Sequence, residues 1–302
     1  MSTRGGRVLA QGKINLRLRV LSKEQSGYHG VETIFARIDL ADDVVVKVDG
    51  AGRSVDCRWV VEGTSEVIPA ERNLAYRAAS AYQEACGWPG SFAIEIDKRI
   101  PAAGGLGGGS ADAGAVLRIL NFLNSSPLEA KTLLAIAGTL GADVPAMASE
   151  SPTNLAWGRG DRLLAFPALP RALVLLVCPS FGVASSDAYS WFDEQAEQLD
   201  PVTESAQLTL AQLGSWPGVA EVACNDLEPV VVKRYPQIGA LVRKVRLAGA
   251  RIAMMSGSGS AVFGVFDSSP IPAEMADDAP FTNGRSVVTG TATSVVGVEV
   301  LE

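Results

Sequence analysis

Apolar and polar positions alternate over several short stretches of the chain, and apolar positions at helical spacing lie between them. Alternation of this kind predicts strands over residues 8–10, 14–20, 31–38, 43–48 and 92–97. A helix is expected from Asn73, as its N-cap, to Cys86, where Gly87 ends it. A second helix follows the last of these strands, with Ser110 as its expected N-cap.

The remainder of the chain mixes the same two patterns. A helix over 128–140 would end at Gly141, and Pro145 disfavours helical geometry at Val144, which leaves Asp143 in a turn. Further helices are expected near 186–199, 209–213 and 236–247, and strands over 173–177 and 287–300. Residues 251–266 predict a strand, a tight glycine turn and a second strand, and residues 273–279 and 282–285 predict surface loops. Because strands and helices do not alternate regularly, the pattern favours an α+β fold class over a doubly wound sheet.

A glycine-rich segment joins the strand at 92–97 to the helix that follows it. Five of the six residues from Gly104 to Gly109 are glycine. A strand, a glycine loop and a helix N-terminus together predict a phosphate site, because free backbone N–H groups and the helix dipole point at the same anion. Gly109 is followed by Ser-Ala, which excludes a Walker loop, and Ser110 stands where a dinucleotide motif needs its last glycine. A flexible surface linker is the alternative.

Length and charge disfavour several classes of protein. A chain of 302 residues with 47% hydrophobic residues can bury a large core in one domain or two. Its formal net charge of −7 disfavours binding to nucleic acid or to an anionic membrane surface. Four dispersed cysteines and one histidine form no zinc pattern, and the first residues show no apolar core of signal-peptide length. We therefore expect a cytoplasmic protein with free thiols.

Further motifs stand in a fixed order around the glycine loop. Four of them are Gly12-Lys-Ile-Asn-Leu16, Gly27-Tyr-His29, Leu140-Gly-Ala-Asp-Val-Pro145 and Met255-Ser-Gly-Ser-Gly-Ser-Ala261. In this order they resemble the GHMP kinases, the relatives of galactokinase, homoserine kinase, mevalonate kinase and phosphomevalonate kinase. Three more, Asn73-Leu-Ala-Tyr76, Gly158-Arg-Gly160 and Asn225-Asp-Leu-Glu228, resemble the branch that phosphorylates 4-diphosphocytidyl-2-C-methyl-D-erythritol. The likeness runs from about residue 8 to residue 266.

This resemblance implies both an architecture and a reaction. The architecture would be a GHMP-kinase fold, with a ribosomal-protein-S5-like domain over residues 1–165 and a ferredoxin-like domain over residues 166–302. The reaction would be transfer of the ATP γ-phosphoryl group to the 2-hydroxyl of 4-diphosphocytidyl-2-C-methyl-D-erythritol, with Mg²⁺ as cofactor. The partner would be this small molecule, and we expect a monomer or weak homodimer.

The resemblance also implies catalytic and substrate residues. Asp143 would accept the proton of the attacking hydroxyl, and Lys13 beside it would stabilise developing negative charge. Asn15 would contact the substrate. Tyr28 would stack on the cytosine and His29 would bind its edge. A second stacking residue would be Tyr189, with Trp191, Phe181 or a core role for Tyr189 as alternatives.

The nucleotide side of the site would be built mainly from backbone. The implied ATP-binding residues are Pro101, Ala102, Ala103, Gly104, Gly105, Leu106, Gly107, Gly108, Gly109, Ser110 and Ala111, and Ser110 would also reach Mg²⁺. Asn73 and Lys98 would contact the adenine side, unless they are a helix cap and a solvated strand end. The turn at 256–260 is expected to pack beside the loop. Gly114 departs from the family pattern and should cost roughly 1 kcal/mol of helix stability relative to alanine.

Two other functions remain open. One is a different GHMP kinase, such as a homoserine or mevalonate kinase. Tyr28 and His29 disfavour it, because such substrates carry no base. The other is a catalytically silent nucleotide-binding regulator, which the presence of both Lys13 and Asp143 disfavours.

Overall fold

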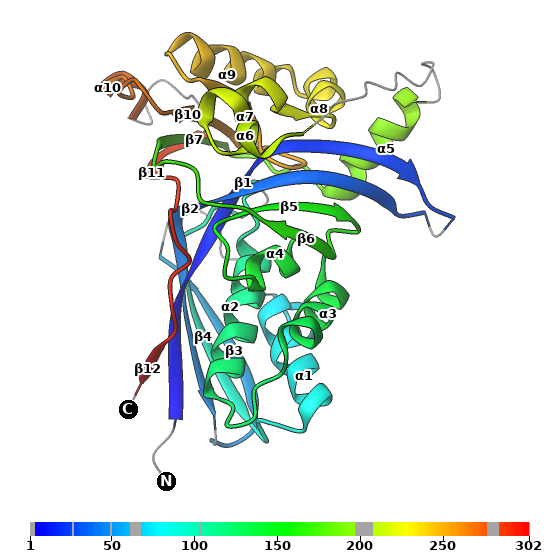
Figure 1. Ribbon diagram of the computed structural model, residues 1–302, viewed down its shortest axis with the longest axis vertical. Coiled ribbons are helices and arrows are strands. Elements are labelled where there is room, and N and C mark those ends of the chain that lie inside the picture. The colour runs from blue at the N-terminus through cyan, green and yellow to red at the C-terminus, as the bar shows by residue number, and fades with distance from the viewer. Residues whose placement is uncertain are drawn as a thin grey trace.

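Two strands of 20 residues each form the centre of the larger sheet. A computed structural model describes residues 4–25, 27–48, 50–60, 68–102, 104–196, 208–276 and 284–301. In it β1 (Arg4–Lys23) and β2 (His29–Val48) pair antiparallel along their whole length and bend midway (Figure 1). Four shorter strands were predicted here, over 8–10, 14–20, 31–38 and 43–48. The breaks predicted at 11–13 and 39–42 are wrong, because β1 and β2 are each continuous. Register shifts between Gln11 and Lys13 and between Asn15 and Arg17 absorb the irregular positions, so pairing continues past them.

The other strands of this sheet come from distant parts of the chain. The sheet has the order β12-β1-β2-β4-β3, with β3 at Arg53–Trp59, β4 at Phe92–Lys98 and β12 at Glu299–Leu301. The strand β5 (Thr153–Gly158) pairs with β2 and with β6 (Arg162–Ala165), and β8 (Cys224–Asn225) runs parallel to β1. The first strand is therefore completed by segments more than 200 residues away.

Helices cover one face of this sheet. They are the 3₁₀ turn η1 (Ala70–Arg72), α1 (Leu74–Cys86), α2 (Gly108–Leu123), α3 (Ala130–Leu140) and α4 (Val144–Ala148). Figure 1 shows the four α-helices on the same side. The predicted ends of α1 are confirmed: the Asn73 side chain accepts a hydrogen bond from the Ala75 N–H, and Gly87 is left-handed. Apolar side chains of α1 and α2, such as Tyr82 and Leu120, are fully buried.

Two predictions are wrong, one for the start of a helix and one for a residue expected outside any helix. Ser110 is not the N-cap of α2, because the helix begins two residues earlier and the Ala111 N–H already bonds to the Gly107 carbonyl. Val144 is helical although a proline follows it. The first N–H groups of a helix have no partner within it, so Pro145 removes no bond from the first turn of α4.

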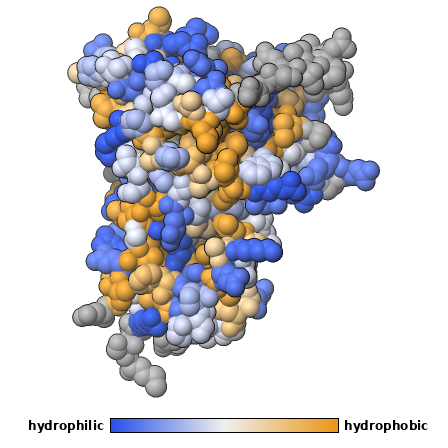
Figure 2. All heavy atoms as spheres, viewed as in Figure 1, coloured by the Kyte–Doolittle hydropathy of each residue, from blue (hydrophilic) through white to orange (hydrophobic). Residues whose placement is uncertain are grey.

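A second sheet of four antiparallel strands packs with its own helices. Its order is β11-β7-β10-β9, with β7 at Leu173–Pro179, β9 at Ile252–Met255, β10 at Val262–Phe266 and β11 at Gly284–Gly290. The helices are α5 (Ser185–Ala196), α6 (Leu210–Leu213), α7 (Trp216–Val222), α8 (Glu228–Arg234), α9 (Pro236–Leu247) and α10 (Ala273–Ala276). Figure 2 shows hydrophilic and hydrophobic residues mixed over the end of the molecule where α9 lies.

Several predictions for this second half need correction. The single strand expected over 287–300 is two strands, β11 and β12, which belong to different sheets. Residues 273–276 form a short helix instead of a loop, and α7 and α8 were not predicted. The expected helix at 236–247 is confirmed at both ends. No helix in the described ranges combines the length and apolar character needed to cross a membrane.

Candidate functional site

A cleft of about 1320 Å³ is lined by residues from both halves of the chain. Its lining comes from β1, β2 and β3, the starts of α1 and α2, the glycine loop, α5 and the turn between β9 and β10. Of the residues singled out in the sequence, Lys13, Asn15, Tyr28, His29, Asn73, Lys98, Ser110, Asp143 and Tyr189 all line it, as do most residues of the glycine loop. Ala103 lies outside the described residues.

The glycine loop is held by its carbonyl groups. The Leu106 carbonyl accepts a hydrogen bond of 2.9 Å from the Lys13 N–H, and the Gly104 carbonyl accepts one of 3.3 Å from the Ala261 N–H. The Ser256 hydroxyl donates to the Gly105 carbonyl at 3.0 Å, which confirms that the 256–260 turn packs beside the loop. With its carbonyls turned to the scaffold, the loop and the N-terminus of α2 offer N–H groups to an anion.

Glycine is required at two positions of this loop for different reasons. Both Gly105 and Gly107 have φ of 72°, a left-handed conformation that side chains rarely adopt. A β-carbon at Gly105 would lie 2.0 Å from the Ser256 carbonyl oxygen. At Gly107 it would lie 3.0 Å from the Lys13 side chain. The loop therefore packs against the second sheet on one side and Lys13 on the other.

The turn opposite the loop is anchored by the Asn225–Glu228 motif. The Asn225 amide donates hydrogen bonds of 2.8 Å to the carbonyls of Met255 and Gly257. The Glu228 carboxylate accepts one of 2.7 Å from the Met255 N–H, and burial raises the pKa of this carboxyl. The resemblance gave this motif no role, and the structure shows that it fixes the turn at the edge of the cleft.

Lys13 and Asp143 lie together although 130 residues separate them. The Lys13 ammonium is 3.3 Å from the Asp143 carboxylate and also donates to the Asn15 side-chain oxygen. Lys13 is 2% exposed, whereas the Asp143 side chain is 31% exposed and faces the cleft. The Asn15 amide donates to the Thr33 hydroxyl at 2.8 Å, which fixes its orientation. The pair thus joins a buried positive charge to an accessible carboxylate.

The position of Asp143 is set by elements packed around α4. The Arg37 guanidinium donates to three carbonyls at the C-terminal end of that helix, those of Ala146, Met147 and Ser149, at 3.0, 2.8 and 2.8 Å. Burial lowers the pKa of Arg37 to about 9. On the other side, a β-carbon at Gly160 would lie 2.1 Å from the Ala142 carbonyl. The Gly158–Gly160 motif therefore supports the residue that precedes Asp143.

Gly114 has a packing role that the sequence did not reveal. A β-carbon there would lie 2.5 Å from the main-chain carbon of Met147 in α4. The expectation that glycine only weakens α2 relative to alanine is therefore wrong, because alanine would not fit. The missing side chain lets α2, which starts at the glycine loop, pack directly on the helix that starts after Asp143.

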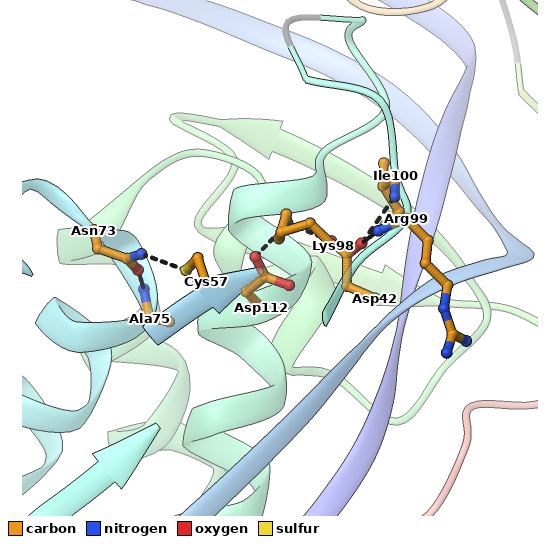
Figure 3. Close-up of polar contacts among 8 residues, drawn as sticks. All are labelled: Asp42, Cys57, Asn73, Ala75, Lys98, Arg99, Ile100 and Asp112. Atoms are coloured by element: carbon orange, nitrogen blue, oxygen red, sulfur yellow. Dashed lines mark hydrogen bonds and ion pairs between the residues drawn. The ribbon is translucent and has the colours of Figure 1, made fainter. Parts of the chain in front are cut away.

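Lys98 and Asn73 both have structural partners at the nucleotide end (Figure 3). The Lys98 ammonium lies between Asp42 and Asp112 and donates to both, at 2.5 Å to Asp112. Burial raises the pKa of Asp112 to about 7. Asn73 caps α1 and its amide donates to the Cys57 sulfur at 3.3 Å. Lys98 is thus a buried connection between β4, β2 and α2, not the solvated strand end considered above, and it donates to two acidic side chains.

The opposite end of the cleft is built from side chains. The His29 ring stacks on Tyr189, with centroids 5.1 Å apart and planes 23° from parallel. His29 Nε2 is 2.6 Å from an Asp193 carboxylate oxygen, and Lys23 reaches the other oxygen at 2.5 Å. Tyr28 is 44% exposed and carries the Arg159 guanidinium over its ring at 5.2 Å. Sequence reasoning missed Asp193, which has no motif around it.

The alternatives to Tyr189 lie elsewhere. Phe181 stacks on Tyr235 at 4.9 Å, and Trp191 packs on the same tyrosine at 6.2 Å. Neither lines the cleft. Tyr189 does, and burial raises the pKa of its hydroxyl, with the nearby charge of Asp143 as a smaller cause.

Comparison with known proteins identifies the family. The model of the GHMP kinases N terminal domain matches residues 73–151, and the model of the GHMP kinases C terminal matches residues 208–281. The chain belongs to the GHMP kinase family. The predicted fold and enzyme class are therefore confirmed: this GHMP kinase has an α+β fold and is a small-molecule kinase.

Three relatives are similar over most of their length. The 4-diphosphocytidyl-2-C-methyl-D-erythritol kinase of Pelotomaculum thermopropionicum is 40% identical over 260 residues, covering 85% of this chain and 88% of the relative. The enzyme of the same name from Moorella thermoacetica is 37% identical over 287 residues, covering 93% and 97%. A crystal structure of 4-(cytidine 5'-diphospho)-2C-methyl-D-erythritol kinase superposes with a TM-score of 0.73 at 33% identity, covering 95% of this chain and 99% of that one.

Proposed function

We propose that this GHMP kinase transfers the γ-phosphoryl group of ATP to the 2-hydroxyl of 4-diphosphocytidyl-2-C-methyl-D-erythritol. The observation that carries the proposal is the Lys13–Asp143 pair, which lies in one cleft with the glycine loop at one end and the His29–Tyr189 stack at the other. Relatives at 37–40% identity bear the name of this activity. Cleft and relatives therefore support the same substrate, a nucleotide-bearing alcohol.

Phosphoryl transfer needs positioning, charge neutralisation and a group that orients the attacking hydroxyl. The N–H groups of the loop and of the first turn of α2 would bind the triphosphate, and the α2 dipole favours its charge. The Asp143 carboxylate, being accessible, would accept the hydroxyl proton. The Lys13 ammonium would stabilise the charge that develops as the proton leaves, and Asn15 holds that ammonium in place.

The residues present also fit a Mg²⁺ ion that is bound mainly by phosphate. In the described part of the chain no group of three or more acidic, histidine or cysteine side chains could hold a metal, and the Ser110 hydroxyl lines the cleft without bonding to another described residue. Mg²⁺ keeps several waters and takes one or two protein oxygens besides substrate phosphates. Ser110 would supply such an oxygen, and the ion would neutralise triphosphate charge when bound.

At the other end, Tyr28 and Tyr189 would contact the faces of the cytosine and His29 its edge. All three line the cleft. The adenine contacts of Asn73 and Lys98, the division of the chain near residue 165, the monomeric or weakly dimeric state and the cytoplasmic location stay predictions.

The test is ADP release with 4-diphosphocytidyl-2-C-methyl-D-erythritol, homoserine and mevalonate in parallel. We expect turnover with the first alone, because homoserine and mevalonate have no base for the His29–Tyr189 end. Equal turnover of homoserine would refute the proposed substrate.

Replacing Asp143→Asn should lower kcat by about 100-fold or more, the loss expected when positioned proton transfer is removed. Asp187→Asn, at an exposed carboxylate outside the cleft, is the matched control and should retain activity.

A further inference from the structure

We propose that Asp193 is a positioning residue that fixes the hydrogen-bonding direction of His29, so that the imidazole accepts a hydrogen bond from the amino group of a cytosine and rejects the carbonyl of a uracil. The inference rests on the proposed function, because it concerns the base of the proposed substrate. It assigns a residue on α5 to base selection through another residue 164 positions away.

The contact with Asp193 decides which ring nitrogen of His29 carries hydrogen. His29 Nε2 lies 2.6 Å from an Asp193 carboxylate oxygen. An ionised carboxylate only accepts hydrogen bonds, so Nε2 must donate. Burial alone would raise the pKa of Asp193, but the hydrogen bonds from Lys23 and His29 hold it below its ordinary value. The carboxylate is therefore ionised and the Nε2–H form of the ring is favoured.

The other ring nitrogen, Nδ1, is then left as a hydrogen-bond acceptor. In an uncharged imidazole with hydrogen on Nε2, Nδ1 carries a lone pair and accepts hydrogen bonds. No residue in the described ranges bonds to Nδ1, while the side chain lines the cleft and is 10% exposed. The stacked Tyr189 ring fixes the plane of the imidazole. A ligand in the cleft therefore meets an acceptor whose direction is set in advance.

Cytosine and uracil differ in the group that such an acceptor would meet. Cytosine carries an exocyclic amino group at the position where uracil carries a carbonyl oxygen. The Nδ1 lone pair can accept from the amino group, whereas a carbonyl there would leave two acceptors facing each other and unpaired. Sites that rely on such a hydrogen bond discriminate strongly against an analogue that cannot make it.

Lys23 makes the arrangement testable by a single substitution. Its ammonium has three donors and no acceptor, and it holds the second oxygen of Asp193 at 2.5 Å. In Asp193→Asn the amide oxygen should therefore turn to Lys23 and the NH₂ group to His29. Nε2 would then have to accept, and the hydrogen would move to Nδ1. The variant should reverse the direction in which His29 presents itself to the base.

The tautomer can be read without substrate, because His29 is the only histidine in the chain. Untagged protein with ¹⁵N-labelled histidine gives one set of ring nitrogen signals, recorded by NMR at a pH where the ring is uncharged. We expect a protonated Nε2 and an unprotonated Nδ1 in the parent protein, and a shift toward protonated Nδ1 in Asp193→Asn. A parent protein with the hydrogen on Nδ1, or a variant with unchanged signals, would overturn the inference.

The kinetic test compares the cytidine substrate with its uridine counterpart. We expect the parent enzyme to prefer cytidine in kcat/KM by about 100-fold or more, and Asp193→Asn to reduce that ratio by about tenfold or more. Most of the change should be in KM for the nucleotide-bearing alcohol, with kcat on the cytidine substrate altered less. Asp193→Ala, which removes the acceptor without adding a donor, should give an intermediate ratio.

Lys23→Met is the matched control, because it removes one partner of Asp193 but leaves the contact to His29. It should keep the base preference of the parent enzyme. Turnover of the cytidine substrate with an unchanged ratio in Asp193→Asn would overturn this inference alone. Absence of turnover in the parent enzyme would overturn the proposed function and the inference with it.

Discussion

The two ends of the cleft differ in what they offer to a ligand, which is backbone at one end and side chains at the other. At the phosphate end, the surface offered to a ligand is backbone: loop and helix N–H groups held by carbonyls that bond to Lys13, Ser256 and Ala261. At the base end the surface is a cluster of side chains, with His29 and Tyr189 stacked and Asp193 behind them. The phosphate end therefore depends on positions that have no side chain, whereas the base end depends on contacts between particular side chains.

This difference decides what a substitution can do at each end. Adding atoms should damage the phosphate end, because there is no room for them. Changing the kind of hydrogen bond or removing a ring should alter selectivity at the base end while leaving the phosphate end intact.

The largest effect is expected for Gly105→Ala. The new β-carbon would lie 2.0 Å from the Ser256 carbonyl at a φ of 72°, so the loop must move. We expect kcat/KM for ATP to fall by about 100-fold or more, since strain of this kind costs roughly 1–3 kcal/mol before the clash is added. Gly138→Ala, on α3 outside the cleft, is the control, with its β-carbon at an ordinary 3.7 Å from the Asp161 side chain. A similar loss in both variants would show that the clash is not the cause.

Gly114→Ala should lower the free energy of unfolding by about 2 kcal/mol, as overpacking of a core does. Its β-carbon would collide with the main chain of α4. Gly138→Ala, at an exposed position of α3, should instead raise the free energy of unfolding by about 0.5–1 kcal/mol, because alanine favours the helix. Denaturant unfolding of both variants measures whether each substitution lowers or raises the free energy of unfolding. Stabilisation by Gly114→Ala would contradict the close packing of α2 and α4.

Tyr189→Leu tests the base end by itself. Loss of the ring that stacks on His29 should raise KM for the cytidine substrate about tenfold, as an aromatic contact of about 1.4 kcal/mol would. KM for ATP should stay within about twofold. Tyr235→Leu, which removes a ring that stacks on Phe181 outside the cleft, is the control for destabilisation. An equal rise in both KM values for Tyr189→Leu would mean that the two ends are not independent.

The smallest effect is expected for Glu228→Gln, at the residue that binds the Met255 N–H before the 256–260 turn. Burial raises the pKa of Glu228, so ionisation costs stability in the folded state. The free energy of unfolding is therefore higher when Glu228 is protonated. This additional stability is lost as the pH rises from the ordinary pKa of 4.5 through the raised pKa of the folded protein. Glutamine keeps an oxygen for the Met255 N–H without that charge.

The Glu228→Gln variant should therefore unfold with a free energy up to about 1 kcal/mol above that of the parent protein at pH 7, and nearly equal to it at pH 4. Glu274→Gln, at an exposed position of α10, should show no such pH dependence. A difference that is the same at both pH values would rule out ionisation of Glu228 as its cause.

Much of the phosphate end could be predicted from the sequence, because it is local. The glycine loop, the strand before it and the helix after it are consecutive, and α1 ends where Asn73 and Gly87 predict. The error at Ser110 is also local: glycine itself begins the helix, so the usual N-cap residue is not needed. The proximity of Lys13 and Asp143 followed from resemblance, and the structure bears it out.

The base end could be predicted only in part. Tyr28 and His29 belong to a motif, but Asp193 is an ordinary acidic residue in an amphipathic helix. Its role depends on a contact between α5 and the start of β2, and no periodicity or spacing indicates such a contact. The long strands β1 and β2 were missed for a related reason, since bulges hide the alternation where the strands bend.

The clash predicted at Gly105 has an evolutionary consequence. It is with a carbonyl oxygen, an atom that every amino acid carries, so no exchange at residue 256 could make room. At Gly264 the obstructing atom belongs to the Val245 side chain, 2.3 Å from the missing carbon, and a smaller residue there would remove it. A search for compensating second mutations should therefore succeed at 264 and return only reversion at 105.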